Sequence, residues 1–565
     1  MSKHGLLQRH RLSPDTPPPR VAARAGGEGA TLPGGTRRPS PGVPGAVATV
    51  AVSLAAVAYI AVLAVRLPAF LAQAVPNSDT VSAPLLAAAI GTPGHGAVFL
   101  GNHPGYIDLL LSALALHLPD QAVSSQAVTW AVYAAGCLLL AATLRRLAGW
   151  TAAGMAALLS LAAAPALLAS EASPAGRVPS LANLVLLGWL ATVLFGGRRR
   201  AALGGRRRGT SAIAALALAV GLVTGLDTVS DPLLAVVGVI PFLGTGLVLG
   251  LRCRDRNAAT LAFGTAVAAV AGVASALLTI AVAGALSLRA LPNPVHLASL
   301  RAALHTLHIL GGDTGIALGG IFSTLGSGTM TYLETGVALL VCAAVVATVV
   351  HAGRSVAGPR PETGRDRAEL AHLVFWALVA ATDLTVFLAT SYAVDLTAYR
   401  FLTPLLVASA ALLPLLGRHR PAGRAVIAVG VAALAAANAW ALASIGLPAP
   451  VQSTPLVRAL EASGVRNVYA DYWEANVTTW ATGGRLDVRP VTECGMAGTQ
   501  LCPVLVNAAA GWFLNPPGLT AVVVDPSRSV KRAPSATYGE PQRVIRIGNV
   551  TIYVYSHALR LTASG

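Results

Sequence analysis

The sequence predicts a polytopic α-helical membrane protein with a small α/β domain at its C-terminal end. Hydrophobic residues make up 55% of the chain and charged residues only 11%, whereas soluble domains carry about 25% charged residues. Apolar windows of about 20 residues, the length that crosses a bilayer core, recur along most of the chain. Beyond residue 446 the apolar residues become sparser and begin to alternate, which is typical of strands.

The first 45 residues are rich in Pro, Gly, Arg and Ser and have no periodic apolar face. We expect them to form a disordered cytoplasmic tail. A long apolar span follows at 46–66, with no clear small-residue cleavage site after it, so we expect a retained membrane anchor and not a removed signal peptide.

Residues 46–446 form the predicted transmembrane domain, with about eleven helices. The apolar run at 105–118 is too short to cross a bilayer, and we expect an interfacial or re-entrant helix there. The spans are expected near 46–66, 123–144, 151–170, 179–197, 210–226, 232–251, 258–287, 332–352, 370–391, 400–417 and 424–446.

The formal net charge of +17 does not indicate a nucleic-acid partner, because the arginines gather in alternate loops between the spans. Such a bias marks the cytoplasmic loops of a membrane protein. With eleven spans, all basic clusters fall on one side, which places the N-terminus in the cytoplasm and the C-terminal domain outside the plasma membrane. The clusters lie at 20–38, 145–146, 198–208, 252–256, 354–367 and 418–424.

Two loops on the opposite side, 67–122 and 288–331, are longer than a connection between helices requires. We expect them to fold over the outer bilayer face as a lid or a cavity roof. Charged and polar side chains on this side are the candidate site residues: Asp79, His103 and Asp108 in the first loop, and Arg177, Asp227, Asp231 and Arg400 at later outer helix ends.

Residues 447–565 form the predicted extracytoplasmic α/β domain, with a helix at 455–462 and strands at 465–469, 521–525, 543–547 and 550–555. Cys494 and Cys502 lie close together in a compartment that permits disulfides, so we predict that they pair. The other cysteines, at 137, 253 and 342, fall in or beside spans and are expected to be small buried hydrophobes. No CxxC or HExxH spacing indicates a metal site.

The segment 464–480 contains the run "YADYW" (469–473) and resembles a segment that follows the last spans of bacterial membrane glycosyltransferases of the GT-C superfamily. The segment 225–242 (GLDTVSDPLLAVVGVIPF), the run "YRFLTP" at 399–404 and an acidic residue in a long loop after the first span are similar to the same family. The resemblance implies a mannosyltransferase-like or arabinosyltransferase-like enzyme that takes a sugar from a polyprenyl-phosphate donor at the outer face of the membrane.

The resemblance further implies that Asp79 is the general base. An inverting transfer needs a carboxylate that takes the proton from the acceptor hydroxyl. The departing lipid phosphate gains negative charge, and the planar guanidinium groups of Arg400 and Arg177 are suited to bind it. Supporting roles are expected for Asp108, His103, Asp227 and Asp231, and a divalent metal ion held by such carboxylates stays open. The Ala, Arg and Gly bias indicates a high-GC bacterium, hence a cell-envelope glycan or glycolipid as the acceptor.

Other interpretations stay open. Asp79 follows Asn77 before an apolar run and is also suited to cap a helix. Asp227 and Asp231 also fit a cap and a turn before Pro232, and Arg400 fits an interface anchor. Asp383 lies inside the ninth span, which keeps a transporter or exporter as an alternative. A non-catalytic scaffold of the same fold is the third hypothesis.

Overall fold

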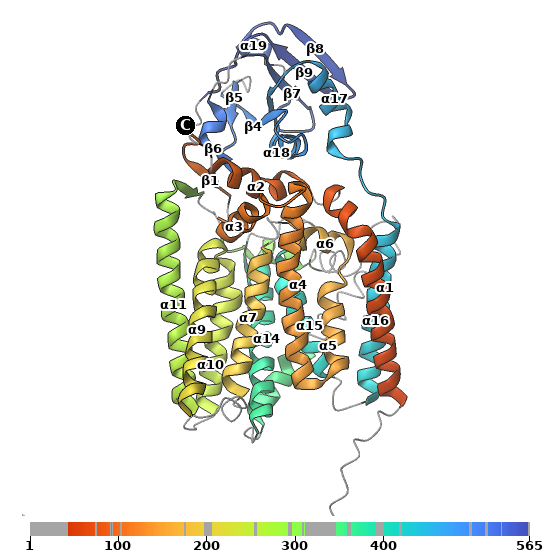
Figure 1. Cartoon of the computed structure of the whole chain (residues 1–565), viewed down its shortest axis with the longest axis vertical. Helices are drawn as coiled ribbons and strands as arrows, with labels where there is room; N and C mark the ends of the chain where they lie inside the picture. The colour runs from red at the N-terminus through yellow and green to blue at the C-terminus, as the bar shows by residue number, and fades with distance from the viewer. Residues whose placement is uncertain are drawn as a thin grey trace, which may run out of the picture. The chain divides into compact units, whose positions relative to one another are not determined.

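Long apolar helices build most of the chain, as the hydropathy pattern predicts (Figure 1). Residues 43–565 form one compact unit. The structure, a computed structural model, describes residues 43–73, 76–90, 92, 94–101, 104–173, 177–196, 206–252, 257–291, 296–307, 310, 346–347, 349–358, 363–390, 400–416, 421–495, 500–514, 518–532 and 534–562.

Within these residues, seven helices are long and apolar enough to cross a membrane, and an eighth crossing results if a bent helix pair counts as one span. The protein is a multi-pass membrane protein. The long helices are α1 (Val43–Gln73), α4 (Gln121–Ala148), α9 (Arg206–Ser230), η1 with α10 (Ala235–Val239 and Ile240–Arg252), α11 (Asn257–Ala285), α14 (Gly364–Ala389) and α16 (Pro421–Ser444). Shorter apolar helices are α2 (Ser78–Ile90), α3 (Tyr106–Ala115), α7 (Val178–Gly196) and α15 (Thr403–Leu416).

The predicted spans coincide with described helices, apart from the span at 332–352, most of which lies outside the described residues. The span at 151–170 is broken into α5 (Trp150–Leu161) and α6 (Pro165–Glu171), which meet at an angle of 86°. Pro165 interrupts the helical hydrogen bonds. The carbonyl oxygens released at the break find side-chain donors, because Asn438 Nδ2 donates to Ala162 O at 2.8 Å and Tyr59 Oη to Ala163 O at 3.1 Å.

Small residues let neighbouring helices approach closely, which is typical of membrane interiors. Helices α9 and α11 pack along much of their length. A Cβ atom at Gly221 would overlap the backbone of Ala268, and one at Gly225 would overlap the backbone of Gly272. Gly225 opens the segment 225–242 that carries Asp227 and Asp231, so this packing holds the backbone beneath both carboxylates.

Three described arginines of the predicted cytoplasmic loops make contacts at one end of the helices. The Arg252 guanidinium donates to Gly358 O, and Arg365 Nη2 donates to Leu147 O at 2.6 Å. Arg145, at the end of α4, lies over the ring of Trp150 at 3.7 Å. These contacts link α14 to α4, α10 to the segment before α14, and α4 to α5, at the helix ends that lie opposite α2 and α3 (Figure 1).

The first long loop folds into α2, β1 (Val98–Leu100) and α3 at the other end of the helices (Figure 1). Strand β1 pairs in parallel with β2 (Leu288–Ala290) and antiparallel with β6 (Ala508–Ala509). This small sheet therefore joins segments of both long loops, 67–122 and 288–331, to the C-terminal region.

The C-terminal region contains a six-stranded sheet in the order β5-β4-β3-β7-β9-β8. Its three central strands β4, β3 and β7 run parallel, and the outer pairs are antiparallel. The apolar core beneath the sheet is formed largely by aliphatic side chains. The elements are α17 (Pro455–Ala462), β3 (Asn467–Ala470), α18 (Tyr472–Ala481), β4 (Asp487–Cys494), β5 (Gln500–Pro503), β7 (Thr520–Val524), α19 (Ser535–Tyr538), β8 (Arg543–Ile547) and β9 (Val550–Tyr555).

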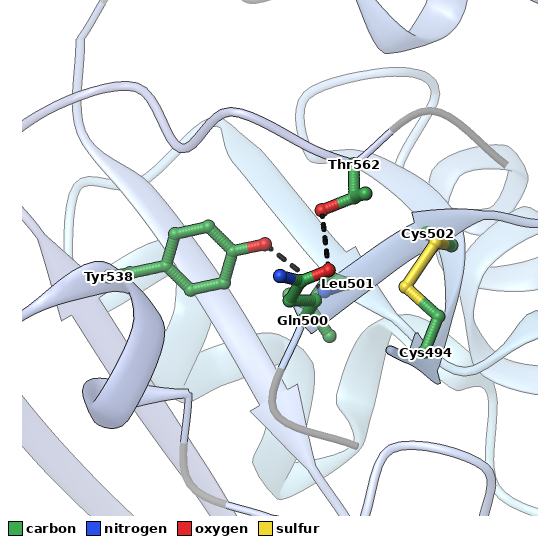
Figure 2. Close-up of a disulfide and its surroundings, with 6 residues drawn as sticks. All are labelled: Cys494, Gln500, Leu501, Cys502, Tyr538 and Thr562. Atoms are coloured by element: carbon green, nitrogen blue, oxygen red, sulfur yellow. Dashed lines mark hydrogen bonds between the residues drawn. A yellow bond between two sulfur atoms is a disulfide. The ribbon is translucent and has the colours of Figure 1, made fainter. Parts of the chain in front are cut away.

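Cys494 and Cys502 form a disulfide that closes the β4–β5 hairpin (Figure 2). Two further contacts hold β5 beside it: Leu501 N donates to Tyr538 Oη at 3.1 Å, and Thr562 Oγ1 donates to Gln500 Oε1 at 3.3 Å. The short β6 strand that pairs with the first outer loop follows soon after this hairpin, so the crosslink lies close in sequence to a contact with the membrane part.

Candidate functional site

Arg177 and Arg400, the two arginines predicted to bind the donor phosphate, line one pocket although they precede different helices. The guanidinium carbon of Arg177 lies 4.8 Å from the centre of the Phe401 ring, and that of Arg400 lies 5.2 Å from it. Two cations beside one aromatic ring offer planar donors to a phosphate oxygen. The pocket is small, with a cavity volume of about 20 Å³, and is lined by Arg177, Ser180, Leu181, Leu184, Asp231, Leu233, Leu234, Val237, Arg400, Phe401 and Pro404.

The backbone of Arg177 is held in an unusual conformation. Its φ angle is 58°, in the left-handed region that costs a residue other than glycine about 1 kcal/mol or more. The carbonyl of Arg177 accepts the N–H of Leu181 at 3.2 Å in the first turn of α7. Its guanidinium forms an ion pair with Asp231, with 3.5 Å between Nη1 and Oδ1. Strained backbone is found preferentially at functional sites, and Arg177 is itself one of the residues that line the pocket.

Asp231 and Asp227 have different surroundings, although the sequence suggests a cap and a turn for both. Asp231 Oδ1 accepts the N–H of Leu233 at 3.2 Å, which fits the predicted turn before Pro232, and it also pairs with Arg177. Asp227 accepts Ser180 Oγ at 2.8 Å and Asn183 Nδ2 at 3.0 Å, both from α7. Asp227 therefore joins two helices and does not act as a local cap.

Asp108 is buried in α3 beside this pair of carboxylates. Burial raises the pKa of the Asp108 carboxyl well above its usual range, and the charges of Asp227 and Asp231 raise it further. The start of α3 is bound to the end of α9, because Gly105 N donates to Ser230 O at 3.1 Å and Ile107 N to Ser230 Oγ at 3.1 Å. Helix α3 thus lies next to the pocket.

A π-helical turn follows these acids, η1 at Ala235–Val239. Such turns contain an extra residue and occur frequently at functional sites. Val237 from this turn and Leu234 before it line the arginine pocket. The segment 225–242 therefore contributes both a carboxylate, Asp231, and apolar side chains to the lining of the pocket.

Asp79 lies half-buried in the first turn of α2 and contacts the C-terminal region. Tyr472 Oη donates a hydrogen bond to Asp79 Oδ1 at 2.6 Å, and the Ser78 hydroxyl donates to the backbone oxygen of Tyr472. Burial and the neighbouring Asp79 carboxylate raise the pKa of Tyr472 above its usual value, so its hydroxyl keeps the proton that it donates.

The alternative in which Asp79 caps α2 is wrong, because Asn77 does so. Asn77 Oδ1 accepts the N–H of Thr80 at 3.0 Å, and the Thr80 hydroxyl accepts the N–H of Asn77 at 2.8 Å. This reciprocal pair satisfies the helix start. The carboxylate of Asp79 is thereby left for other partners.

Not all predicted site residues come together. Asp79 forms no hydrogen bond or ion pair with Arg177 or Arg400 in the described part of the chain; α2 packs on α3, and α3 adjoins the pocket. His103 lies outside the described residues. Sequence reasoning missed four residues that make contacts here: Phe401, Ser180, Asn183 and Asn507. It also gave no role to Tyr472 within the "YADYW" run.

No protein-family model and no curated protein matches this sequence. Among solved structures, the chain is similar to ArnT from Cupriavidus metallidurans in the apo state, with 13% identity, a TM-score of 0.44, and coverage of 88% of this chain and 97% of that one. It is also similar to the oligosaccharyltransferase AglB from Archaeoglobus fulgidus, solved with an inhibitory peptide and a dolichol-phosphate, with 13% identity, a TM-score of 0.40, and coverage of 78% of this chain and 64% of that one. At these values the likenesses assign neither a substrate nor a residue role to this chain.

Proposed function

We propose that this multi-pass membrane protein is an inverting glycosyltransferase that moves a hexose or pentose from a polyprenyl-phosphate donor to a cell-envelope glycan or glycolipid. The reaction takes place at the outer face of the plasma membrane, with the N-terminus in the cytoplasm and the C-terminal domain outside. The family resemblance in the sequence points to the GT-C superfamily for this chemistry.

The observation that carries the proposal is the convergence of Arg177 and Arg400 on Phe401. Leu181, Leu184 and Val237 supply apolar wall to the same pocket. A polyprenyl phosphate needs cationic donors for its phosphate and an apolar surface for its chain, and this pocket offers both. Asp231 beside Arg177 orients the guanidinium group.

In the proposed reaction, an acceptor hydroxyl oxygen attacks the anomeric carbon of the donor sugar. The bond from that carbon to the phosphate oxygen breaks, and its electron pair stays with the lipid phosphate. Asp79 takes the proton of the attacking hydroxyl, and Arg177 and Arg400 stabilise the phosphate charge. Attack from the face opposite the leaving group inverts the anomeric configuration.

The proposal gives supporting roles to three carboxylates beside the pocket, Asp108, Asp227 and Asp231. Asp227 holds α7 to α9, and Asp231 holds Arg177. Within the described ranges, no group of three or more His, Cys, Asp or Glu side chains is placed to hold a metal ion. No step of the proposed reaction depends on one.

The test is an Asp79→Asn substitution in a deletion strain complemented with the full chain. The amide keeps the size of the side chain but cannot take the proton, so we expect loss of one envelope glycan or glycolipid. The matched control is Asp120→Asn, because Asp120 is an exposed acid of the same outer loop. Glycan composition is compared at equal amounts of membrane-inserted protein.

A second assay uses the purified protein in nanodiscs with radiolabelled polyprenyl-phosphate mannose and polyprenyl-phosphate arabinose. Release of polyprenyl phosphate by the wild type and by Asp120→Asn, but not by Asp79→Asn, is the expected result. An unchanged envelope in the Asp79→Asn strain would remove the base from the proposal and favour the scaffold hypothesis.

A further inference from the structure

The C-terminal region reaches into the proposed catalytic site through Tyr472, the first residue of α18. Its hydroxyl has one proton, and the short bond of 2.6 Å to Asp79 Oδ1 uses it. Its backbone oxygen accepts the Ser78 hydroxyl, so Tyr472 is held to α2 through both its side chain and its backbone. The "YADYW" run is visible in the sequence, but the sequence alone assigns no function to Tyr472.

Asn507 determines which way the Tyr472 hydroxyl points. Asn507 Oδ1 accepts the N–H of Gly101 at 2.8 Å, which leaves its amide nitrogen to face Tyr472. Asn507 Nδ2 donates to Tyr472 Oη at 3.1 Å. Because an amide N–H can only donate, the Tyr472 oxygen accepts there and must donate elsewhere, which is to Asp79.

The backbone around Asn507 is built for this contact. Its φ angle is 52°, a left-handed conformation that asparagine adopts more readily than most residues. The next two residues, Ala508 and Ala509, pair with Phe99 and Val98 of the first outer loop. Gly101 packs directly against the Asn507 side chain, and a Cβ atom there would lie 3.0 Å from Asn507 Oδ1.

We propose that Tyr472 is a positioning residue that holds the Asp79 carboxylate in place for proton transfer, with Asn507 orienting the Tyr472 hydroxyl. This inference rests on the proposed function of Asp79. One carboxylate oxygen is bound by Tyr472, and in the proposed reaction the other, Oδ2, takes the proton of the acceptor hydroxyl. The C-terminal region is then part of the catalytic site and not only a binding module.

The experiment measures polyprenyl-phosphate mannose and polyprenyl-phosphate arabinose turnover by the full chain in nanodiscs, at varied donor concentration, for wild type and Tyr472→Phe. We expect kcat to fall about ten- to a hundredfold, because a hydrogen bond to a charged group is lost. KM for the donor stays unchanged, since Tyr472 does not contact the arginine pocket residues in the described part of the chain. Tyr538→Phe is the matched control, because it removes a hydrogen-bonded hydroxyl at β5.

A double-mutant comparison tests Asn507. Asn507→Gly tolerates the positive φ and removes the donor to Tyr472. If Asn507 acts through Tyr472, adding Asn507→Gly to Tyr472→Phe lowers kcat much less than the single Asn507→Gly substitution does in the wild type.

The outcomes separate the two proposals. An active wild type with a Tyr472→Phe variant of unchanged kcat overturns the positioning role. A Tyr472→Phe variant that unfolds at lower temperature but turns over normally overturns it as well and leaves Tyr472 as an anchor. A wild type that releases no polyprenyl phosphate from either donor contradicts the proposed function itself.

Discussion

Asp383 Oδ2 accepts a hydrogen bond from the backbone N–H of Leu405 at 3.1 Å. Helix α15 begins at Thr403, so this N–H belongs to the first turn, where backbone donors have no partner within the helix. Asp383 is only 1% exposed, and the positive charge of Arg177 interacts with it electrostatically. An acid inside a predicted span thus has a structural partner, which weakens the main argument for a transporter.

Substitutions of Asp383 separate these interpretations. Asp383→Asn keeps an oxygen that accepts the Leu405 N–H, whereas Asp383→Ala leaves the donor unpaired and lowers the free energy of unfolding by about 1–3 kcal/mol. Thermal unfolding in detergent measures the difference. Proton-coupled uptake by wild-type liposomes that Asp383→Asn abolishes would instead support the transporter, and equal destabilisation by both variants would contradict the capping role.

Arg177→Lys and Arg400→Lys should each raise the KM for polyprenyl-phosphate donors. Lysine keeps the charge but loses the planar fork that binds phosphate oxygens, and a charge-assisted hydrogen bond corresponds to about a tenfold change or more. Turnover in nanodiscs at varied donor concentration provides the measurement.

Arg145→Lys is the control for this pair, because Arg145 also lies over an aromatic ring, Trp150, but at the opposite end of the helices. A KM increase as large in Arg145→Lys would mean that the effect comes from stability and not from the pocket.

The sequence predicts the helices well because their signal is local. A run of apolar residues must be helical to satisfy its backbone in a membrane, and it needs no knowledge of its neighbours. The break at Pro165 is less visible, because the run 151–170 remains apolar through it. The carbonyl partners from Tyr59 and Asn438, which make the break tolerable, lie on other helices.

The site is predicted only in part. The charge pattern predicts which helix ends lie on the same side, so Arg177 and Arg400 are found, but Phe401 between them is an ordinary apolar residue in sequence. Asp79 and Tyr472 are far apart in the chain, and their hydrogen bond depends on how the C-terminal region docks on α2. No local pattern encodes such a contact, although the unusual "YADYW" run marks its position.

Replacing Cys494 and Cys502 by serine should destabilise the C-terminal region by about 2–3 kcal/mol, because the crosslink restricts a short loop of the unfolded chain. Thermal unfolding measures the loss. Both cysteines fall in one tryptic peptide, 486–528, so mass spectrometry with and without reduction detects the bond directly.

Cys137→Ser serves as the comparison, since Cys137 is a buried free thiol of α4 and its substitution leaves that peptide unchanged. Alkylation of Cys494 and Cys502 without prior reduction would contradict the disulfide.

Glu474 in α18 should make the stability of the C-terminal region depend on pH. Burial raises the pKa of Glu474, and the Asp525 carboxylate raises it further, although Arg528 opposes them. Between the ordinary and the raised value, the folded protein keeps a proton that the unfolded chain has lost, so stability falls as the pH rises through this window and stays lower above it. Glu474→Gln removes the titration and should raise the unfolding temperature at neutral pH but not at pH below the ordinary glutamate pKa, as thermal unfolding across pH would show. Glu540→Gln, at an exposed position, is the control and should leave the unfolding temperature unchanged at both pH values. If Glu474→Gln raises the unfolding temperature equally at every pH, packing and not charge causes the gain.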